Sequence, residues 1–112
     1  MKKISVLLSL LLICFITNAQ SKDTLAVKPD PTKKTQVVEA ACGQCKFGLE
    51  GKACDLAVRI DGKAYYVDGT KIDDHGDAHA EDGFCNAIRK AEVQGTVVDG
   101  RFKATYFKVK KD

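Results

Sequence analysis

Four cysteines are the residues of this chain whose spacing best suits chemistry. Cys42 and Cys45 form the motif Cys-Gly-Gln-Cys, and Cys54 and Cys85 follow it. A two-residue gap lets both thiolates of a Cys-x-x-Cys motif bind one tetrahedral ion, and two further thiolates or a histidine can complete the coordination. Thiolate ligands suit zinc and copper. A zinc or copper site is therefore one prediction for this set.

The same cysteines suit two disulfide bonds, which is the interpretation that the sequence favours. An export signal, described below, would place the chain where thiols oxidise, and a small domain gains stability from cross-links. The pairing stays open, although a bridge from Cys42 or Cys45 to Cys85 would close the longest loop. Thiol-redox chemistry at Cys42 and Cys45 is a further alternative, but Gly48 and Gly51 disfavour the helix that would stabilise a thiolate there.

Two histidines lie in an acidic segment between Cys54 and Cys85. His75 and His79 are four residues apart, so a helix would place both imidazoles on one side, near several aspartates. Gly76 interrupts such a helix. We therefore expect a solvated acidic loop, with a separate zinc or copper site at His75 and His79 as the alternative.

The N-terminus has the order of a secretory signal peptide. Lys2 and Lys3 precede an apolar run from residue 4 to residue 16, and Thr17-Asn18-Ala19 ends it with a small residue. The run is shorter than the roughly 20 apolar residues that span a bilayer. We expect cleavage after Ala19, an exported protein in the periplasm or outside the cell, and no transmembrane segment after cleavage.

The remaining chain divides into a linker and one domain. Residues 20–34 contain Pro29, Pro31 and several lysines with few large apolar groups, which predicts a flexible linker. Residues 35–112 form the predicted domain, a small cysteine-containing β-barrel. Its size makes a cross-link or a metal a common addition to the hydrophobic core.

Two hairpins are the clearest structural signals in this domain. Alternating apolar residues flank Asp61-Gly62 and again flank Asp99-Gly100, which are turn pairs typical of hairpins. Residues 35–40 suit a first strand, and Asp82 can cap a helix that runs from Phe84 to Ala91. In the last strand the apolar face changes after Tyr106, as a β-bulge would cause. The order β-β-β-α-β-β predicts a mainly β fold, a five-stranded OB-type barrel with one short helix.

Charge and aromatic residues limit the predicted partners. The formal net charge is +3, and Lys2 and Lys3 lie in the signal segment, so the exported part is nearly neutral and nucleic acid is not an expected partner. No phosphate-binding glycine loop or nucleophile motif is present in the sequence, so we expect a protein that is not an enzyme. We expect a monomer that binds an unknown protein or small ligand. A candidate partner surface consists of aromatic side chains at Tyr65, Tyr66, Tyr106 and Phe107.

Three motifs carry a resemblance to a known family. They are Cys42-Gly43-Gln44-Cys45-Lys46-Phe47-Gly48, then the stretch from Asp73 to His79, and then Gly83 to Lys90. In these the chain resembles a family of small exported bacterial proteins, frequent in Bacteroidetes, whose function is uncharacterised. The resemblance implies an exported, cysteine-dependent domain without naming a substrate. Taken together, these observations predict an exported binding or structural module with two disulfides, and a metal-binding or thiol-redox protein as the alternative.

Overall fold

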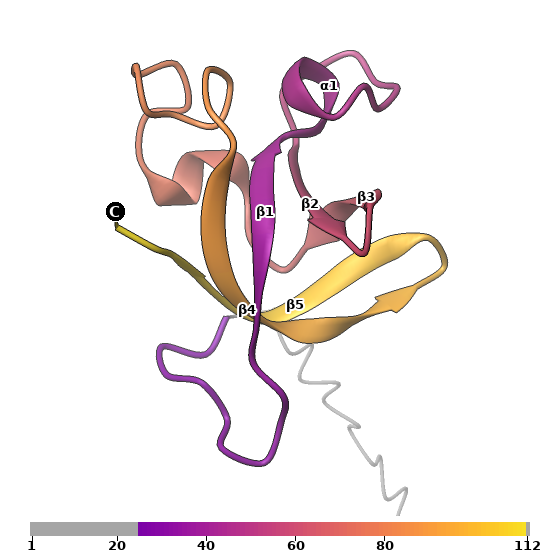
Figure 1. The fold of residues 1–112 in the computed structure, drawn as a ribbon, viewed down its shortest axis with the longest axis vertical. Helices are drawn as coiled ribbons and strands as arrows, with labels where there is room; N and C mark the ends of the chain where they lie inside the picture. The colour runs from indigo at the N-terminus through magenta and orange to yellow at the C-terminus, as the bar shows by residue number, and fades with distance from the viewer. Residues whose placement is uncertain (1–24, 112) are drawn as a thin grey trace, which may run out of the picture.

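The computed structural model describes residues 25–111, and its regular structure is mostly β (Figure 1). The elements in chain order are β1 (Gln36–Cys42), α1 (Gly43–Lys46), β2 (Leu56–Ile60), β3 (Lys63–Asp68), the 3-10 helix η1 (Ile72–His75), β4 (Arg89–Val98) and β5 (Arg101–Val109). No helix in this described part is long and apolar enough to cross a membrane.

The five strands close into a barrel in the order β1-β2-β3-β5-β4. Neighbouring strands are antiparallel except β3 and β5, which pair in parallel, and β1 closes the barrel by pairing with β4. Closure leaves no long unpaired edge, so a small sheet satisfies its own backbone hydrogen bonds. The predicted fold class, a mainly β five-stranded barrel of OB type, is confirmed.

Both predicted hairpins are present, and their turns explain the Asp-Gly pairs. Asp61 and Gly62 have φ angles of 50° and 83°, and Asp99 and Gly100 have φ angles of 52° and 77°. Two successive left-handed residues form the turn whose twist matches the flanking strands, and aspartate followed by glycine adopts it at low cost. These two turns fix the register of β2 with β3 and of β4 with β5.

The predicted bulge lies in β5. Gln94 pairs with Tyr106 and Gly95 pairs with Ala104, which leaves Thr105 as the extra residue. The bulge changes the parity of the strand, so that Tyr106 and Phe107 are both buried although they are adjacent. Phe107 belongs to the core cluster inside the barrel, whereas Tyr106 lies outside that cluster.

The short helix between the third and fourth strands is not where the sequence predicted it. The prediction of a helix from Phe84 to Ala91 was wrong, because β4 begins at Arg89 and Ala91 is a fully buried strand residue. The amides of Asn86 and Ala87 donate to the Gly83 carbonyl and form a single turn. The chain then extends because β1 needs β4 as its second partner. The helix that this connection does contain is η1.

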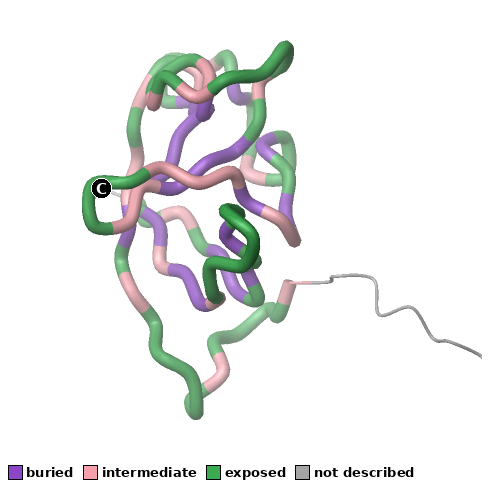
Figure 2. The backbone as a smooth tube through the Cα atoms, turned by 90° about the vertical axis from the view of Figure 1, so that its right-hand side faces the viewer, coloured by how far each residue is buried: buried purple, intermediate pink, exposed green. Residues whose placement is uncertain are grey.

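The core consists of small and branched apolar residues together with the rings of Phe84, Phe102 and Phe107. Phe102, Val58 and Val93 are almost completely buried and point into the barrel from three different strands. Figure 2 shows that burial follows the strands, while the loop below the barrel is mostly exposed.

Residues 25–35 contact the barrel at Gln94 and at the bulge in β5. Gln94 is 1% exposed, accepts a hydrogen bond from the Asp30 amide (2.8 Å), and donates to the Asp30 carbonyl (2.9 Å) and the Thr35 hydroxyl (2.7 Å). The Ala26 amide also donates to the Thr105 carbonyl at the bulge (2.9 Å). Part of the segment predicted as a linker therefore contacts the barrel, and the domain boundary itself stays a prediction.

Candidate metal centre

The four cysteines of the predicted domain meet at one end of the barrel. Cys42 is the last residue of β1, Cys45 lies in α1, and Cys54 comes just before β2. Cys85 belongs to the connection that leads into β4. In Figure 1, α1 and the loops before β4 lie at the same upper end, beside the end of β1. The barrel thus brings together two loops that are far apart in the sequence.

The sulfur atoms form a compact group. The Cys54 Sγ lies 3.3 Å from the Cys42 Sγ, 3.4 Å from the Cys45 Sγ and 3.1 Å from the Cys85 Sγ, and all four sulfurs lie within 4.8 Å of one another. A tetrahedral zinc ion with bonds of about 2.3 Å places its sulfur ligands about 3.8 Å apart. A disulfide would instead bring two sulfurs to about 2.05 Å. In the described structure the four cysteines form no disulfide, and their sulfurs lie close enough together to share one ion.

Backbone hydrogen bonds hold the two loops in this position. The Cys42 amide donates to the Phe84 carbonyl (2.9 Å), which ties the end of β1 to the residue before Cys85. The Cys85 amide donates to the Ala78 carbonyl (2.9 Å) within its own loop. On the other side, Cys42 pairs with Leu56 in the β1–β2 ladder, so Cys54 lies near the same strand end. The β1–β2 register and these two hydrogen bonds therefore hold Cys42, Cys54 and Cys85 at the same end of the barrel.

Gln44 and Asp55 connect the Cys-x-x-Cys turn to the third cysteine. The Gln44 side chain donates to the Asp55 carboxylate (2.8 Å) and accepts from the Asp55 amide (2.9 Å). The Gly43 amide donates to the Asp55 carbonyl (2.8 Å). These bonds make Gln44 and Asp55 positioning residues for the cluster. The sequence analysis missed this role, because nothing in the spacing of a glutamine and an aspartate indicates that they meet.

The cluster also stabilises one thiolate. Burial raises the pKa of the Cys42 thiol, but hydrogen bonds from the thiol and the backbone amide of Cys45 outweigh it and lower the pKa below its ordinary value. Donation to the Cys42 sulfur raises the pKa of Cys45 to about 12, and hydrogen bonding with Cys85 raises the pKa of Cys54 to about 11. The cluster thus favours the thiolate form at Cys42 and the protonated form at Cys45 and Cys54. A bound cation reverses this preference, because each ligand must then be a thiolate.

The two histidines are separate from the cysteine cluster and from each other. The His75 ring lies 4.7 Å from the Phe107 ring, centroid to centroid, and its Nε2 is 2.8 Å from the Thr70 hydroxyl. Burial lowers the pKa of His75 and so favours the neutral imidazole. The His79 side chain is 80% exposed. Within residues 25–111, the only group of three or more metal-ligating side chains close enough to share an ion is the set of four cysteines.

The aromatic residues of the predicted partner surface differ in exposure. Tyr106 and Phe107 are 6% and 7% exposed, so neither ring is available for stacking on this surface. Tyr65 is half-buried and packs against the core. The Tyr66 hydroxyl donates to the Glu50 carbonyl (2.5 Å), which holds the loop that follows α1. A partner could meet only Tyr65 and Tyr66 of these four.

Comparison with known proteins gives a family without an activity. The model of a family described as "Family of unknown function (DUF6370)" matches residues 36–110, which contain the whole barrel and all four clustered cysteines. No curated protein and no solved structure matches the chain.

Proposed function

Since the chain belongs to this family of unknown function, we propose a function from its own geometry: it is an exported module whose four cysteines bind one zinc ion. The observation that carries the proposal is the arrangement of the Cys42, Cys45, Cys54 and Cys85 sulfurs within 4.8 Å of one another. A tetrahedral set of four sulfurs suits zinc. Export rests on the signal sequence before Gln20.

A structural role follows from the number of ligands. Four cysteines fill a tetrahedral coordination shell, so no open position remains for a water or a substrate. The ion would join the β1–β2 end of the barrel to the loop before β4, which are 31 residues apart between Cys54 and Cys85. Such a link stabilises a domain whose core is small. The module would then present its surface to a protein or small-molecule partner and would not be an enzyme.

Composition and mass of the exported protein test this proposal. The full chain is produced in a bacterial host that exports it, and the purified protein is examined by elemental analysis, thiol titration and intact mass without reductant. We expect one zinc per chain and reactive thiols only after chelation. We also expect the mass of a chain whose first residue is Gln20. A metal-free protein with no thiols and a mass lower by four hydrogens would replace the zinc site with two disulfides. A mass that retains residues 1–19 would contradict export.

The pH dependence of stability should differ in sign between the metal-free and the zinc-bound protein. In the metal-free protein the pKa values of Cys45 and Cys54, about 12 and about 11, lie above the ordinary value of 9.0. The folded state therefore retains these protons, and its stabilisation is present below pH 9 and is lost as the pH rises through these values. In the zinc-bound protein the ligands are thiolates, so acidification protonates them and releases the ion.

Thermal unfolding followed by circular dichroism, with chelator or with zinc, measures the pH dependence of the Tm of the metal-free and of the zinc-bound protein. We expect the Tm of the chelated protein to fall with rising alkalinity and the Tm of the zinc-bound protein to fall with acid. Identical profiles in the two conditions would show that zinc does not bind the cluster.

A further inference from the structure

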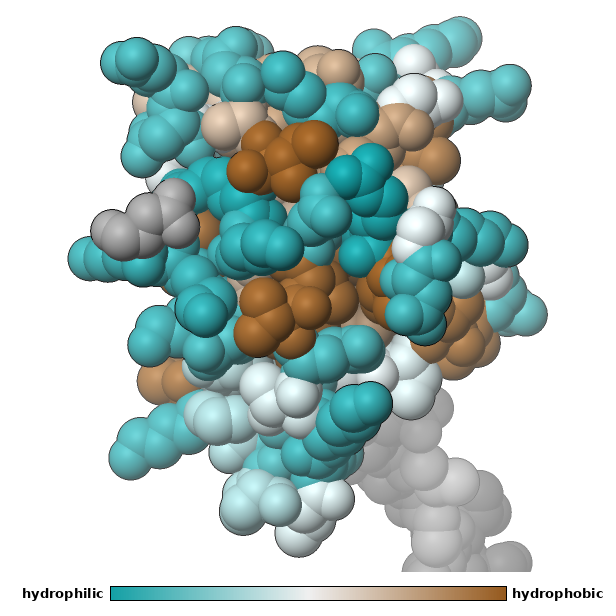
Figure 3. All heavy atoms as spheres, in the orientation of Figure 1, coloured by the Kyte–Doolittle hydropathy of each residue, from teal (hydrophilic) through white to brown (hydrophobic). Residues whose placement is uncertain are grey.

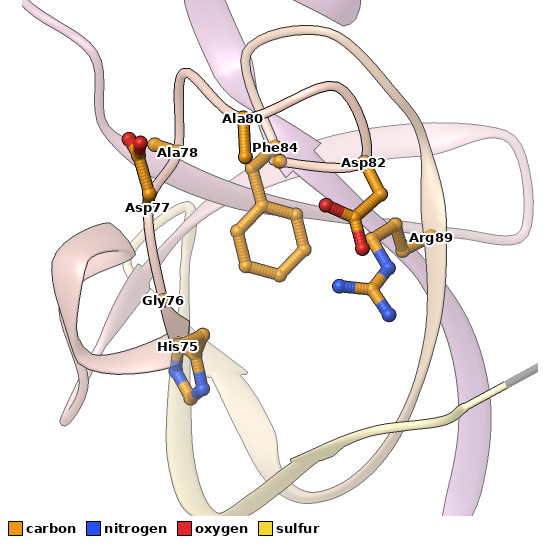
Figure 4. Close-up of a pocket in the computed structure, with 9 residues that line it drawn as sticks. His75, Gly76, Asp77, Ala78, Ala80, Asp82, Phe84 and Arg89 are labelled. Atoms are coloured by element: carbon orange, nitrogen blue, oxygen red, sulfur yellow. The ribbon is translucent and has the colours of Figure 1, made fainter.

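A separate pocket lies next to the cysteine cluster and has no part in the proposed zinc site. Its volume is about 160 Å³, and the connection from His75 to Phe84 together with Arg89 of β4 forms its wall. Figure 4 shows the Phe84 ring in the middle of the pocket, His75 at one side, and Asp82 and Arg89 at the other. The Asp77 carboxylate points away from the pocket in the same view.

The backbone around the pocket is tightly fixed. The Asn86 side chain donates to the carbonyls of His79 (3.0 Å) and Ala80 (2.8 Å), and the Gly83 amide donates to the Ala80 carbonyl (2.9 Å). The Cys85 amide bond to the Ala78 carbonyl closes the same loop. The pocket is therefore formed before any ligand arrives, which lowers the cost of binding.

Two opposite charges lie at this pocket without partners. The Asp82 carboxylate and the Arg89 guanidinium extend to the same side, next to the Phe84 ring (Figure 4). Within the described residues, neither of these side chains forms a salt bridge or a side-chain hydrogen bond, although three ion pairs of arginine or lysine with a carboxylate are present elsewhere. The wall has two other titratable groups: burial lowers the pKa of His75 and so favours its neutral form, and the Asp77 carboxylate accepts a hydrogen bond from the His79 amide (2.9 Å) and points away from the pocket. The charges that face the pocket are thus one negative and one positive.

Size limits the ligand that this pocket can hold. A protein cavity of roughly 150 Å³ accommodates benzene, which has six heavy atoms. The space here, about 160 Å³, therefore suits a molecule of about that size. An arginine guanidinium binds a carboxylate with two parallel hydrogen bonds, and a carboxylate accepts from an ammonium group. The smallest molecules that satisfy both groups at once are the small α-amino acids.

We propose that this pocket binds a small zwitterionic amino acid of the size of alanine, with its carboxylate at Arg89 and its ammonium at Asp82. The methyl group would lie against Phe84 and the small side chains of Ala78 and Ala80.

An extended apolar surface is a weaker candidate for a binding role. The exposed large apolar residues include Val37, Val97 and Val98 of two strands, and the face in Figure 3 shows only separate hydrophobic groups among hydrophilic ones.

Amide chemical shifts of the exported protein, produced from the full chain and supplemented with zinc, are followed during titration with L-alanine to test this site. We expect saturable shifts confined to residues 75–89. Propionate, which lacks the ammonium, and ethylamine, which lacks the carboxylate, should each bind at least tenfold more weakly, because each engages one charge. Asp82→Asn and Arg89→Gln should each weaken alanine binding at least tenfold. Lys90→Gln is the matched control, since this exposed neighbour lies outside the pocket wall.

The possible results separate cleanly. Saturable alanine shifts that are lost in both pocket variants and kept in Lys90→Gln support the proposal. Absence of saturable shifts, equal binding of propionate, or unchanged binding in either pocket variant overturns it. Zinc content is measured on each sample, so a protein that binds alanine without zinc would contradict the metal centre and leave the pocket intact.

Discussion

Replacing Cys54 with serine is expected to weaken zinc binding more than one-hundredfold and to lower the Tm by about 10–20 °C. Cys54 has the central position in the cluster, because its sulfur lies within 3.4 Å of each of the other three. A hundredfold loss in the affinity of a ligand that binds only the folded state costs about 2.7 kcal/mol. In a domain of this size 1 kcal/mol shifts the Tm by roughly 4–8 °C. Competition with a chelator of known affinity measures zinc binding, and calorimetry measures the Tm.

The same measurements distinguish a shared ion from two bridges. If one ion joins all four sulfurs, Cys42→Ser and Cys85→Ser lower the Tm in parallel with Cys54→Ser, and a double variant loses little more than either single one. With two disulfides, the losses of residues from different bridges would add. Ala53→Ser is the control, because this exposed residue precedes Cys54 and carries no ligand atom of the cluster. A Cys54→Ser protein with the zinc affinity and Tm of the original would contradict the proposed site.

Replacing Gly83 with alanine is expected to destabilise the protein by about 1–3 kcal/mol and to weaken zinc binding roughly tenfold or more. A Cβ at this position would lie 2.3 Å from the Ala78 carbonyl oxygen and 2.4 Å from the Asp77 carbonyl oxygen. Both atoms belong to the backbone, so the loop must move, with the energetic cost typical of overpacking. The Ala78 carbonyl also accepts from the Cys85 amide, so this movement displaces a zinc ligand. Changes of this kind beside a metal ligand reduce affinity by roughly 10–100-fold.

Gly62→Ala provides the comparison for Gly83→Ala. Gly62 has a φ of 83° and no atom within 4 Å of an added Cβ, so alanine there costs only the left-handed conformation, about 1–2 kcal/mol. Denaturant unfolding should report a loss of stability in both variants, whereas chelator competition should report weaker zinc binding in Gly83→Ala alone. Equal zinc affinities in the two variants would show that the loop before Cys85 does not position the ion.

Local signals in the sequence predicted most of the barrel. The two Asp-Gly turns, the alternating apolar residues beside them and the change of parity at Tyr106 each involve residues near one another in the chain. Such signals act within a few residues, so they can be recognised in the sequence without the tertiary structure. The helix predicted after Asp82 failed for the opposite reason. Its apolar spacing suits a helix, but pairing of β4 with β1 requires an extended chain from Arg89 onward.

The cysteines themselves were identified by type and spacing, and the sequence left two chemistries open for them. Cys42 and Cys45 are close by virtue of their two-residue gap, which local geometry alone ensures. Cys54 and Cys85 could not be placed, because their meeting depends on closure of the barrel and on the hydrogen bond from Cys42 to the Phe84 carbonyl. For the same reason the sequence could not predict two further features. These are the contact between Gln44 and Asp55 and the pocket at Asp82 and Arg89.

The sequence by itself determined the strand pairs joined by tight turns, the presence of a set of four cysteines and the near-neutral charge of the domain. The tertiary structure decided which sulfurs meet, which histidine is buried and which charged groups face a common cavity. The physical reason is the range of the interactions. Turns, alternation and the Cys-x-x-Cys spacing arise from neighbouring residues, whereas a four-sulfur site requires the closed barrel to bring two loops, 31 residues apart, to one end of the molecule.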